Sequence, residues 1–132
     1  MTDDFGLLDE VYSMLCKNRE LMALLGSPKT PSERNNKIRR EITPLSFVTV
    51  ENLNFMSIYL SSTTETDNIY VVRAFLNVDY YAKSREELAK IKRLVTETLR
   101  EKDYFAGSMY SIPSETKGVY SYTQKFRPLI FA

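Results

Sequence analysis

Residues 68–103 decide the fold of this chain, and they read NIYVVRAFLNVDYYAKSREELAKIKRLVTETLREKD. From Tyr70 to Tyr80 every second residue is apolar, so one face of the predicted β-strand is continuously hydrophobic. The other face is apolar at its start and polar around Asp79, which is typical of a sheet face that is covered over part of its length. We therefore expect residues 69–81 to form the central strand of a sheet.

A helix signal follows this strand directly. Ser84 and Glu87 have the spacing of a capping box, in which each side chain accepts a hydrogen bond from the other residue's backbone N–H. The apolar residues beyond the cap recur at helical spacing and form one stripe: Leu88, Ile91, Leu94, Val95 and Leu99. We expect this helix, residues 85–102, to lie across the even-numbered face of the strand, because the stripe and that face are the two largest apolar surfaces.

Helical spacing also occurs at the start of the chain. Residues 7–15 carry apolar side chains at this spacing and predict an amphipathic N-terminal helix. Asn18 has a side chain suited to an N-cap, and it would open a short helix over residues 19–25 that Gly26 ends. One bent helix over both segments is the alternative, and the sequence leaves the two open.

The other strands are predicted from β-branched and aromatic residues. Residues 45–50 and 55–60 both have this composition, and we expect both to be extended. Residues 61–68 contain no hydrophobic side chain and predict a polar hairpin tip before the long strand. Two more strands are expected near the C-terminal end, over residues 104–112 and 119–126, around a turn.

Residues 27–44 have a different character. They contain Pro28, Pro31 and Pro44 and offer few apolar positions, so we expect a long excursion without regular structure. Its basic side chains would suit an acidic partner, and a solvated loop is the alternative interpretation.

Together these elements predict an α+β fold in a single domain, residues 1–132. A small, mostly antiparallel sheet packs against a long amphipathic helix, with an N-terminal helix before it. The expected order is helix, two strands, helix, two strands (α-β-β-α-β-β), with flexible excursions near residues 27–44 and 61–68. A chain of 132 residues is long enough to bury such a core without a disulfide or a structural metal.

The amino-acid composition argues against several classes of function. Eighteen basic and 17 acidic side chains give a net charge of +1, which lacks the basic excess of most nucleic-acid binders, so we expect no sequence-specific nucleic-acid binding. The apolar runs are far shorter than the ~20 residues of a membrane span, and the acidic start is unlike a signal peptide. We expect a cytoplasmic protein with no membrane association.

The residues of common catalytic and metal sites are scarce. The chain has no histidine, so its one cysteine, Cys16, has no partner for a Cys/His zinc site, a Cys–His catalytic pair or an internal disulfide. We interpret Cys16 as a packed or half-exposed helix residue. The four glycines are scattered and form no phosphate-binding loop. We therefore expect no catalytic, cofactor-binding or metal-binding residues, and no enzyme activity.

Aromatic residues are concentrated near the C-terminal end: Tyr104, Phe105, Tyr110, Tyr120, Tyr122, Phe126 and Phe131. Interleaved with basic side chains, they are compatible with stacking of single-stranded nucleic acid. Sheet packing or a protein interface is the alternative, and we favour it because tyrosines that alternate with polar residues are common in both settings.

The order of these segments resembles that of one family of viral proteins. The features are the LDEVYSML helix at 8–15, the ELMALLG element at 20–26, the proline-led PLSFVTV segment at 44–50, the strand at 71–81 that passes into the capped helix with KRLV at 92–95, and the C-terminal hairpin. In this order the chain is similar to the tail-completion proteins of long-tailed bacteriophages, also called tail terminator or head-to-tail joining proteins.

This resemblance implies a structural virion protein at the head–tail junction, assembled in the host cytoplasm. It implies a hexameric ring that docks on the tail-tube protein and presents its other face to the head–tail connector protein. Residues 27–43 are longer and more basic than the family pattern, and residues 61–68 are richer in threonine and serine. These departures leave a connector role as stopper or adaptor open, beside a cytosolic α+β binding module.

Candidate interface residues come from the two polar excursions. Arg39 and Arg40 lie on the first, and Glu65 and Asp67 lie on the second. Paired charges of opposite sign at loop tips suit docking of a subunit or a partner, whereas solvated charges without an energetic role are the alternative.

Overall fold

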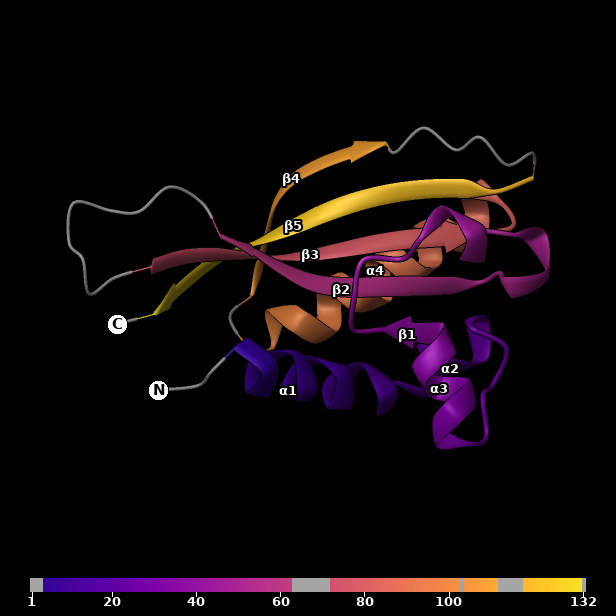
Figure 1. Ribbon diagram of the computed structural model, residues 1–132, viewed down its shortest axis with the longest axis horizontal. Coiled ribbons are helices and arrows are strands. Elements are labelled where there is room, and N and C mark those ends of the chain that lie inside the picture. Colours follow the sequence, from indigo (N-terminus) through magenta and orange to yellow (C-terminus); the bar gives the residue numbers. More distant parts are fainter. Residues whose placement is uncertain (1–3, 63–71, 103, 112–117, 132) are drawn as a thin grey trace.

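The computed structural model describes residues 4–62, 72–102, 104–111 and 118–131. It shows one sheet with α-helices packed against one of its faces (Figure 1). The helices are α1 (Asp4–Cys16), α2 (Arg19–Leu24), α3 (Pro31–Lys37) and α4 (Arg85–Arg100), and two short 3-10 helices are η1 (Leu45–Phe47) and η2 (Val50–Asn52). The strands are β1 (Ile38–Arg39), β2 (Phe55–Ser62), β3 (Val72–Ala82), β4 (Phe105–Ser111) and β5 (Tyr120–Phe131).

The five strands lie in the order β1-β2-β3-β5-β4. Among the strands that the structure describes, β1 pairs in parallel with β2, and the other neighbours are antiparallel. The predicted α+β class and the mostly antiparallel sheet are therefore confirmed, and β3 is the central strand as expected. The element order differs from the predicted one, because α2, α3 and the short β1 also precede β2.

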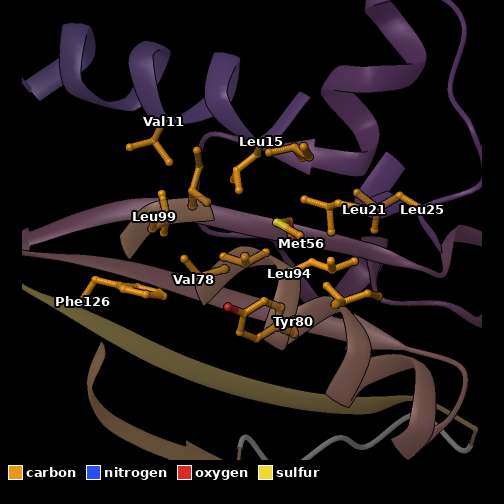
Figure 2. Close-up of a cluster of buried hydrophobic side chains, with 14 of the residues drawn as sticks. Val11, Leu15, Leu21, Leu25, Met56, Val78, Tyr80, Leu94, Leu99 and Phe126 are labelled. Carbon is orange, nitrogen blue, oxygen red and sulfur yellow. The ribbon is translucent and has the colours of Figure 1, made fainter. Parts of the chain in front are cut away.

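The predicted packing of the long helix on the central strand is confirmed. The side chain of Ser84 accepts a hydrogen bond from the backbone N–H of Glu87 at 3.2 Å and caps α4. The even-numbered residues of β3 from Leu76 to Tyr80 are fully buried, and they share one core cluster with the apolar stripe of α4. Figure 2 shows part of this cluster, with side chains of both elements turned toward one another.

The N-terminal segment forms two helices, which decides between the two alternatives. The side chain of Asn18 accepts a hydrogen bond from the backbone N–H of Leu21 and so starts α2. The amide nitrogen of the same side chain donates to the hydroxyl of Thr98 on α4 at 2.9 Å. Both helices bury apolar side chains, including Val11 and Leu15 from α1, in the core under α4 (Figure 2). Cys16 is partly buried at the end of α1, as predicted.

The prediction that residues 27–44 lack regular structure was wrong. The hydroxyl of Thr30 accepts from the backbone N–H of Glu33 at 3.1 Å, and the Glu33 carboxylate accepts from the backbone of Thr30 in return. This complete capping box forms α3, although α3 buries no residue. Ile38 follows, fully buried, and pairs with Met56 on β2. Local capping and one buried anchor therefore order a segment with few apolar positions. Residues 63–68 of the second predicted excursion lie outside the described residues.

The prediction of a strand over residues 45–50 was also wrong, because this segment contains η1 and η2. Its apolar side chains cover one end of the sheet face opposite α4. The ring of Phe47 meets Phe55 edge-on at 5.0 Å, and Phe55 stacks on Tyr81 at 4.6 Å. Val48, Leu53 and Val119 complete this second, smaller core. The β-branched and aromatic composition of this segment thus indicated that its side chains are buried, and not that its backbone pairs in a strand.

The C-terminal strand continues beyond its predicted end. We expected it to stop at residue 126, before Pro128, but β5 runs on to Phe131. Pro128 lies where the register of β5 against β3 shifts, between the pairs Leu76 with Phe126 and Ala74 with Leu129. A proline, which has no backbone N–H, is tolerated in a strand at such an irregularity. Within the described ranges, no helix has both the length and the apolar character needed to cross a membrane.

Candidate functional site: an interface on the open sheet face and its edges

The strand registers line up one polar row across the sheet. Arg39 pairs with Ser57, Ser57 with Asp79, and Asp79 with Thr123, so β1, β2, β3 and β5 each contribute one residue. Their neighbours along the strands, such as Ile38 and Met56, belong to the core under α4. Because successive side chains on a strand point to opposite faces, the polar row lies on the face away from α4.

Asp79 is the centre of this row. Its side chain accepts hydrogen bonds on Oδ1 from the hydroxyl of Thr123 at 2.7 Å and from the hydroxyl of Tyr59 at 3.1 Å. The residue is only 5% exposed. Burial raises the pKa of the Asp79 carboxyl above its ordinary value, and the two hydrogen bonds act in the opposite direction. Beside it, the hydroxyls of Ser57 and Thr43 are hydrogen-bonded to one another.

Asp79 also affects its neighbour Tyr81, which belongs to the smaller core. Burial, and then the nearby Asp79 carboxylate, raise the pKa of Tyr81 to about 12. The tyrosine therefore stays protonated at neutral pH. The hydrogen bonds that Asp79 accepts therefore join β2, β3 and β5 at this row.

Arg39 lies in β1 and not at a loop tip. Its Nη2 donates to Oε1 of Glu41 at 2.8 Å, and its guanidinium lies 4.1 Å from the ring centre of Phe47. The side chain is only 14% exposed. Its Nε is buried and makes no hydrogen bond within the described part of the chain. Arg39 therefore helps to hold the η1 segment against the edge of the sheet.

Arg40 joins the end of β1 to α1. Its Nη1 lies 2.5 Å from Oδ1 of Asp9, and its guanidinium lies 4.4 Å from the ring centre of Tyr12. Nη2 also donates to the side chain of Asn35 on α3 at 3.4 Å. Both arginines line one open hollow of about 240 Å³ beside β1. The structure thus brings two of the four predicted interface residues together, whereas Glu65 and Asp67 lie outside the described residues.

The aromatic residues near the C-terminal end whose side chains the structure describes divide into two groups, and the side chains of Phe105, Tyr110 and Phe131 lie outside that description. Tyr104 and Phe126 are buried in the main core. Tyr120 is 41% exposed and Tyr122 is partly exposed, and each ring has a basic group 5.9 Å from its centre. The basic group is Arg85 over Tyr120 and Lys92 over Tyr122. The core interpretation is confirmed for the first group, whereas the second lies on a surface that also carries α4.

Sequence reasoning missed the contacts of Asp79 with Thr123 and Tyr59. The sequence does contain a signal for these contacts, because the polar residues of the long strand and of the last strand are mainly odd-numbered. It became readable only with the register of β3 against β5, because residues 44 positions apart meet there. A polar stretch on one face of an otherwise apolar strand is thus best interpreted together with the polar face of the strand that pairs with it.

The two edges of the sheet differ. At one edge β4 spans seven residues and, among the described strands, pairs with β5 alone; Figure 1 shows it along the upper border of the sheet. At the other edge β1 pairs over two residues of the much longer β2. Unpaired backbone groups along an edge strand are a ready template for pairing with another chain.

Within the described ranges, no group of three or more histidine, cysteine, aspartate or glutamate side chains is placed to hold a metal ion. Comparison of the sequence with protein-family models and with curated protein sequences finds no match.

Proposed function

We propose that this chain is a structural virion assembly protein that caps the phage tail tube and joins the tail to the head connector, as a hexameric ring. The order of its sequence segments, which resembles the tail-completion proteins, supports this proposal. So does the α+β fold, in which helices fill one face of a mostly antiparallel sheet. Its partners are the tail-tube protein and the head–tail connector protein.

The observation that carries the proposal is the inequality of the two sheet edges. A ring requires a heterologous contact, in which one surface of a subunit meets a different surface of the next. The seven-residue edge of β4 and the short edge at β1 are two such different surfaces on opposite sides of the subunit. Arg39 and Arg40 lie at the β1 edge, where their contacts hold its shape. Repeated contact of β4 with the β1 side of a neighbour closes the ring.

The first test measures assembly directly. The purified protein is examined by light scattering alone and after mixing with the tail-tube protein, and separately with the connector protein. We expect ring-sized species and binding to tail tubes. A chain that binds the connector and ignores the tube acts as a stopper or adaptor, which would overturn the tail-completion role. A chain that stays monomeric and binds neither overturns the virion proposal.

The second test separates docking from folding at the β1 edge. The double reversal R39E/R40E is compared in a phage assembly system with a compensated variant, R39E/R40E/D9R/E41R, which restores both ion pairs with exchanged signs. We expect full capsids and unattached tails from both variants, with thermal unfolding of the compensated variant close to that of the unmodified chain, because the charge of the partly exposed Arg40 is reversed in each. Normal particle yield from the compensated variant would show that these arginines stabilise their own subunit and do not take part in docking.

A further inference from the structure

The side of α4 that faces away from the main core contains a hollow, and the residues that line it do not belong to that core. Its volume is about 390 Å³, which is within the range of ligand-binding clefts. The residues that line it recur at helical spacing: Ala89, Lys92, Arg93, Thr96, Glu97 and Arg100. The small side chains of Ala89 and Thr96 lie between long basic ones, so the helix surface itself forms the floor of the hollow.

The floor of the hollow is anchored to the sheet. The hydroxyl of Thr96 donates to the backbone oxygen of Lys92 at 2.8 Å and accepts from Nε2 of Gln124 on β5 at 3.2 Å. Gln124 accepts in turn from the hydroxyl of Tyr80 at 2.6 Å, inside the core. This chain of hydrogen bonds sets the position of α4 relative to β5. The helix is therefore in place before a ligand binds, and only its exposed side chains have to adjust.

The hollow is basic. Its lining includes three cationic side chains and one carboxylate, that of Glu97. Glu97 lies 4.0 Å from Arg93, and both side chains are about two-thirds exposed, at 66% and 63%. Such an exposed pair is weak, so the Arg93 guanidinium is free to exchange this carboxylate for one from a ligand. Arg100, two turns beyond Arg93, carries a second guanidinium on the same stripe.

Two tyrosine rings of β5 have basic side chains of α4 over them, and one of these basic side chains, Lys92, also lines the hollow. Lys92 lies over the ring of Tyr122, and Arg85 lies over the ring of Tyr120, which is 41% exposed. Tyrosine and arginine are, with tryptophan, the residues most enriched in protein-binding hot spots, because they combine apolar area with directed polar groups. The surface thus offers apolar contact beside positive charge.

From these observations we infer that the outward face of α4 beside β5 binds a short acidic segment of a partner protein. The hollow runs from Ala89 to Arg100, which is ~16 Å of helix and matches about five residues of extended peptide. A nucleic acid is less well matched, because Glu97 opposes a phosphate backbone and a net charge of +1 provides no broad positive field. This inference goes beyond the proposed function and does not depend on it.

The experiment uses two labelled probes. The first is a fluorescein-labelled peptide of six glutamates between two tyrosines, and the second is labelled oligo-thymidylate of about 15 nucleotides, which represents nucleic acid. Fluorescence polarisation gives the affinity of the full chain for each. The variant R93E/R100E removes two cations of the hollow. The matched control, K90E/K102E, makes the same charge change at two exposed lysines that do not line the hollow.

We expect the peptide to bind the unmodified chain and the K90E/K102E control alike, within about twofold, and R93E/R100E to bind at least about tenfold more weakly. We expect E97Q to bind more tightly. All five substituted positions are exposed, so far-ultraviolet circular dichroism should show unchanged folding. Equal losses of peptide affinity in both double variants would show that binding depends only on the net charge of the chain, and would overturn the proposed site. Tighter binding of the oligonucleotide, lost in R93E/R100E, would replace the acidic peptide with nucleic acid, and absence of peptide binding would overturn the inference.

Discussion

The hydroxyl of Thr123 donates a hydrogen bond to Oδ1 of Asp79 at 2.7 Å, across two strands that pair directly at these residues. Both residues are almost fully buried, on the sheet face away from α4. Tyr59 donates a second hydrogen bond to the same oxygen from the other neighbouring strand. One carboxylate therefore joins β2, β3 and β5, and its protonation is linked to the stability of the sheet.

The pH dependence of stability should reveal this carboxylate. Burial raises the pKa of Asp79 in the folded state, so in the interval between its unfolded and folded pKa values the folded chain binds more protons. Stability contributed by Asp79 is thus full below the unfolded pKa and is lost as the pH rises through the folded pKa. We expect urea unfolding of D79N to show a smaller loss of stability between about pH 4 and pH 7 than the unmodified chain. An unchanged pH slope in D79N would contradict the assignment.

Deletion of the same carboxylate should act differently. In D79A the hydroxyls of Thr123 and Tyr59 lose their acceptor, and we expect a loss of about 1–3 kcal/mol at neutral pH. The double variant D79A/T123V removes a donor together with the acceptor, and it should recover part of that loss. Denaturant midpoints of the two variants measure the difference.

The core between α4 and β3 should be sensitive to truncation. Leu76 and Leu94 are 0% and 6% exposed and belong to the same cluster. We expect L76A and L94A each to lower the free energy of unfolding by about 2–5 kcal/mol, because each leaves a cavity. I42A is the control, since Ile42 is 68% exposed and should change stability by less than about 0.5 kcal/mol. A loss of that small size at both core positions would refute the packing.

Arg40 and Asp9 should show measurable coupling. Their side chains are 37% and 64% exposed, so screening by solvent limits the ion pair to about 0–1 kcal/mol. A double-mutant cycle with R40A and D9A, followed by thermal unfolding, gives the coupling energy. The pair of Arg93 and Glu97, at 4.0 Å and more exposed, is the comparison and should give a value near zero. Equal coupling in both pairs would contradict a specific role for Arg40 in holding β1 to α1.

The capping box of α3 should be essential to that helix. Because α3 buries no residue, its cap is its main local support. We expect T30A to destabilise the segment by about 0.5–2 kcal/mol, whereas T30S keeps the hydroxyl and should be nearly neutral. Amide hydrogen exchange over residues 31–37 is the measurement, and identical protection in T30A and the unmodified chain would show that other contacts order α3.

Local sequence signals predicted much of the fold. The alternation around Leu76 identified the central strand, and Ser84 and Asn18 marked two helix starts where their side chains do cap. These signals work because periodicity and capping act between residues a few positions apart. The capping box of Thr30 and Glu33 is present in the sequence as well, but our prediction did not consider it and rested on the prolines and the shortage of apolar residues.

What the sequence by itself determined, then, was the character of each segment: which residues alternate, which form an amphipathic stripe, and where the long helix begins. The tertiary structure alone decided that Phe47 covers Phe55 in place of forming a strand, and that Asp79 meets Thr123 and Arg40 meets Asp9. These last two pairs join residues 44 and 31 positions apart. Such contacts depend on which surfaces remain open after the whole chain has packed, and no local pattern records that outcome.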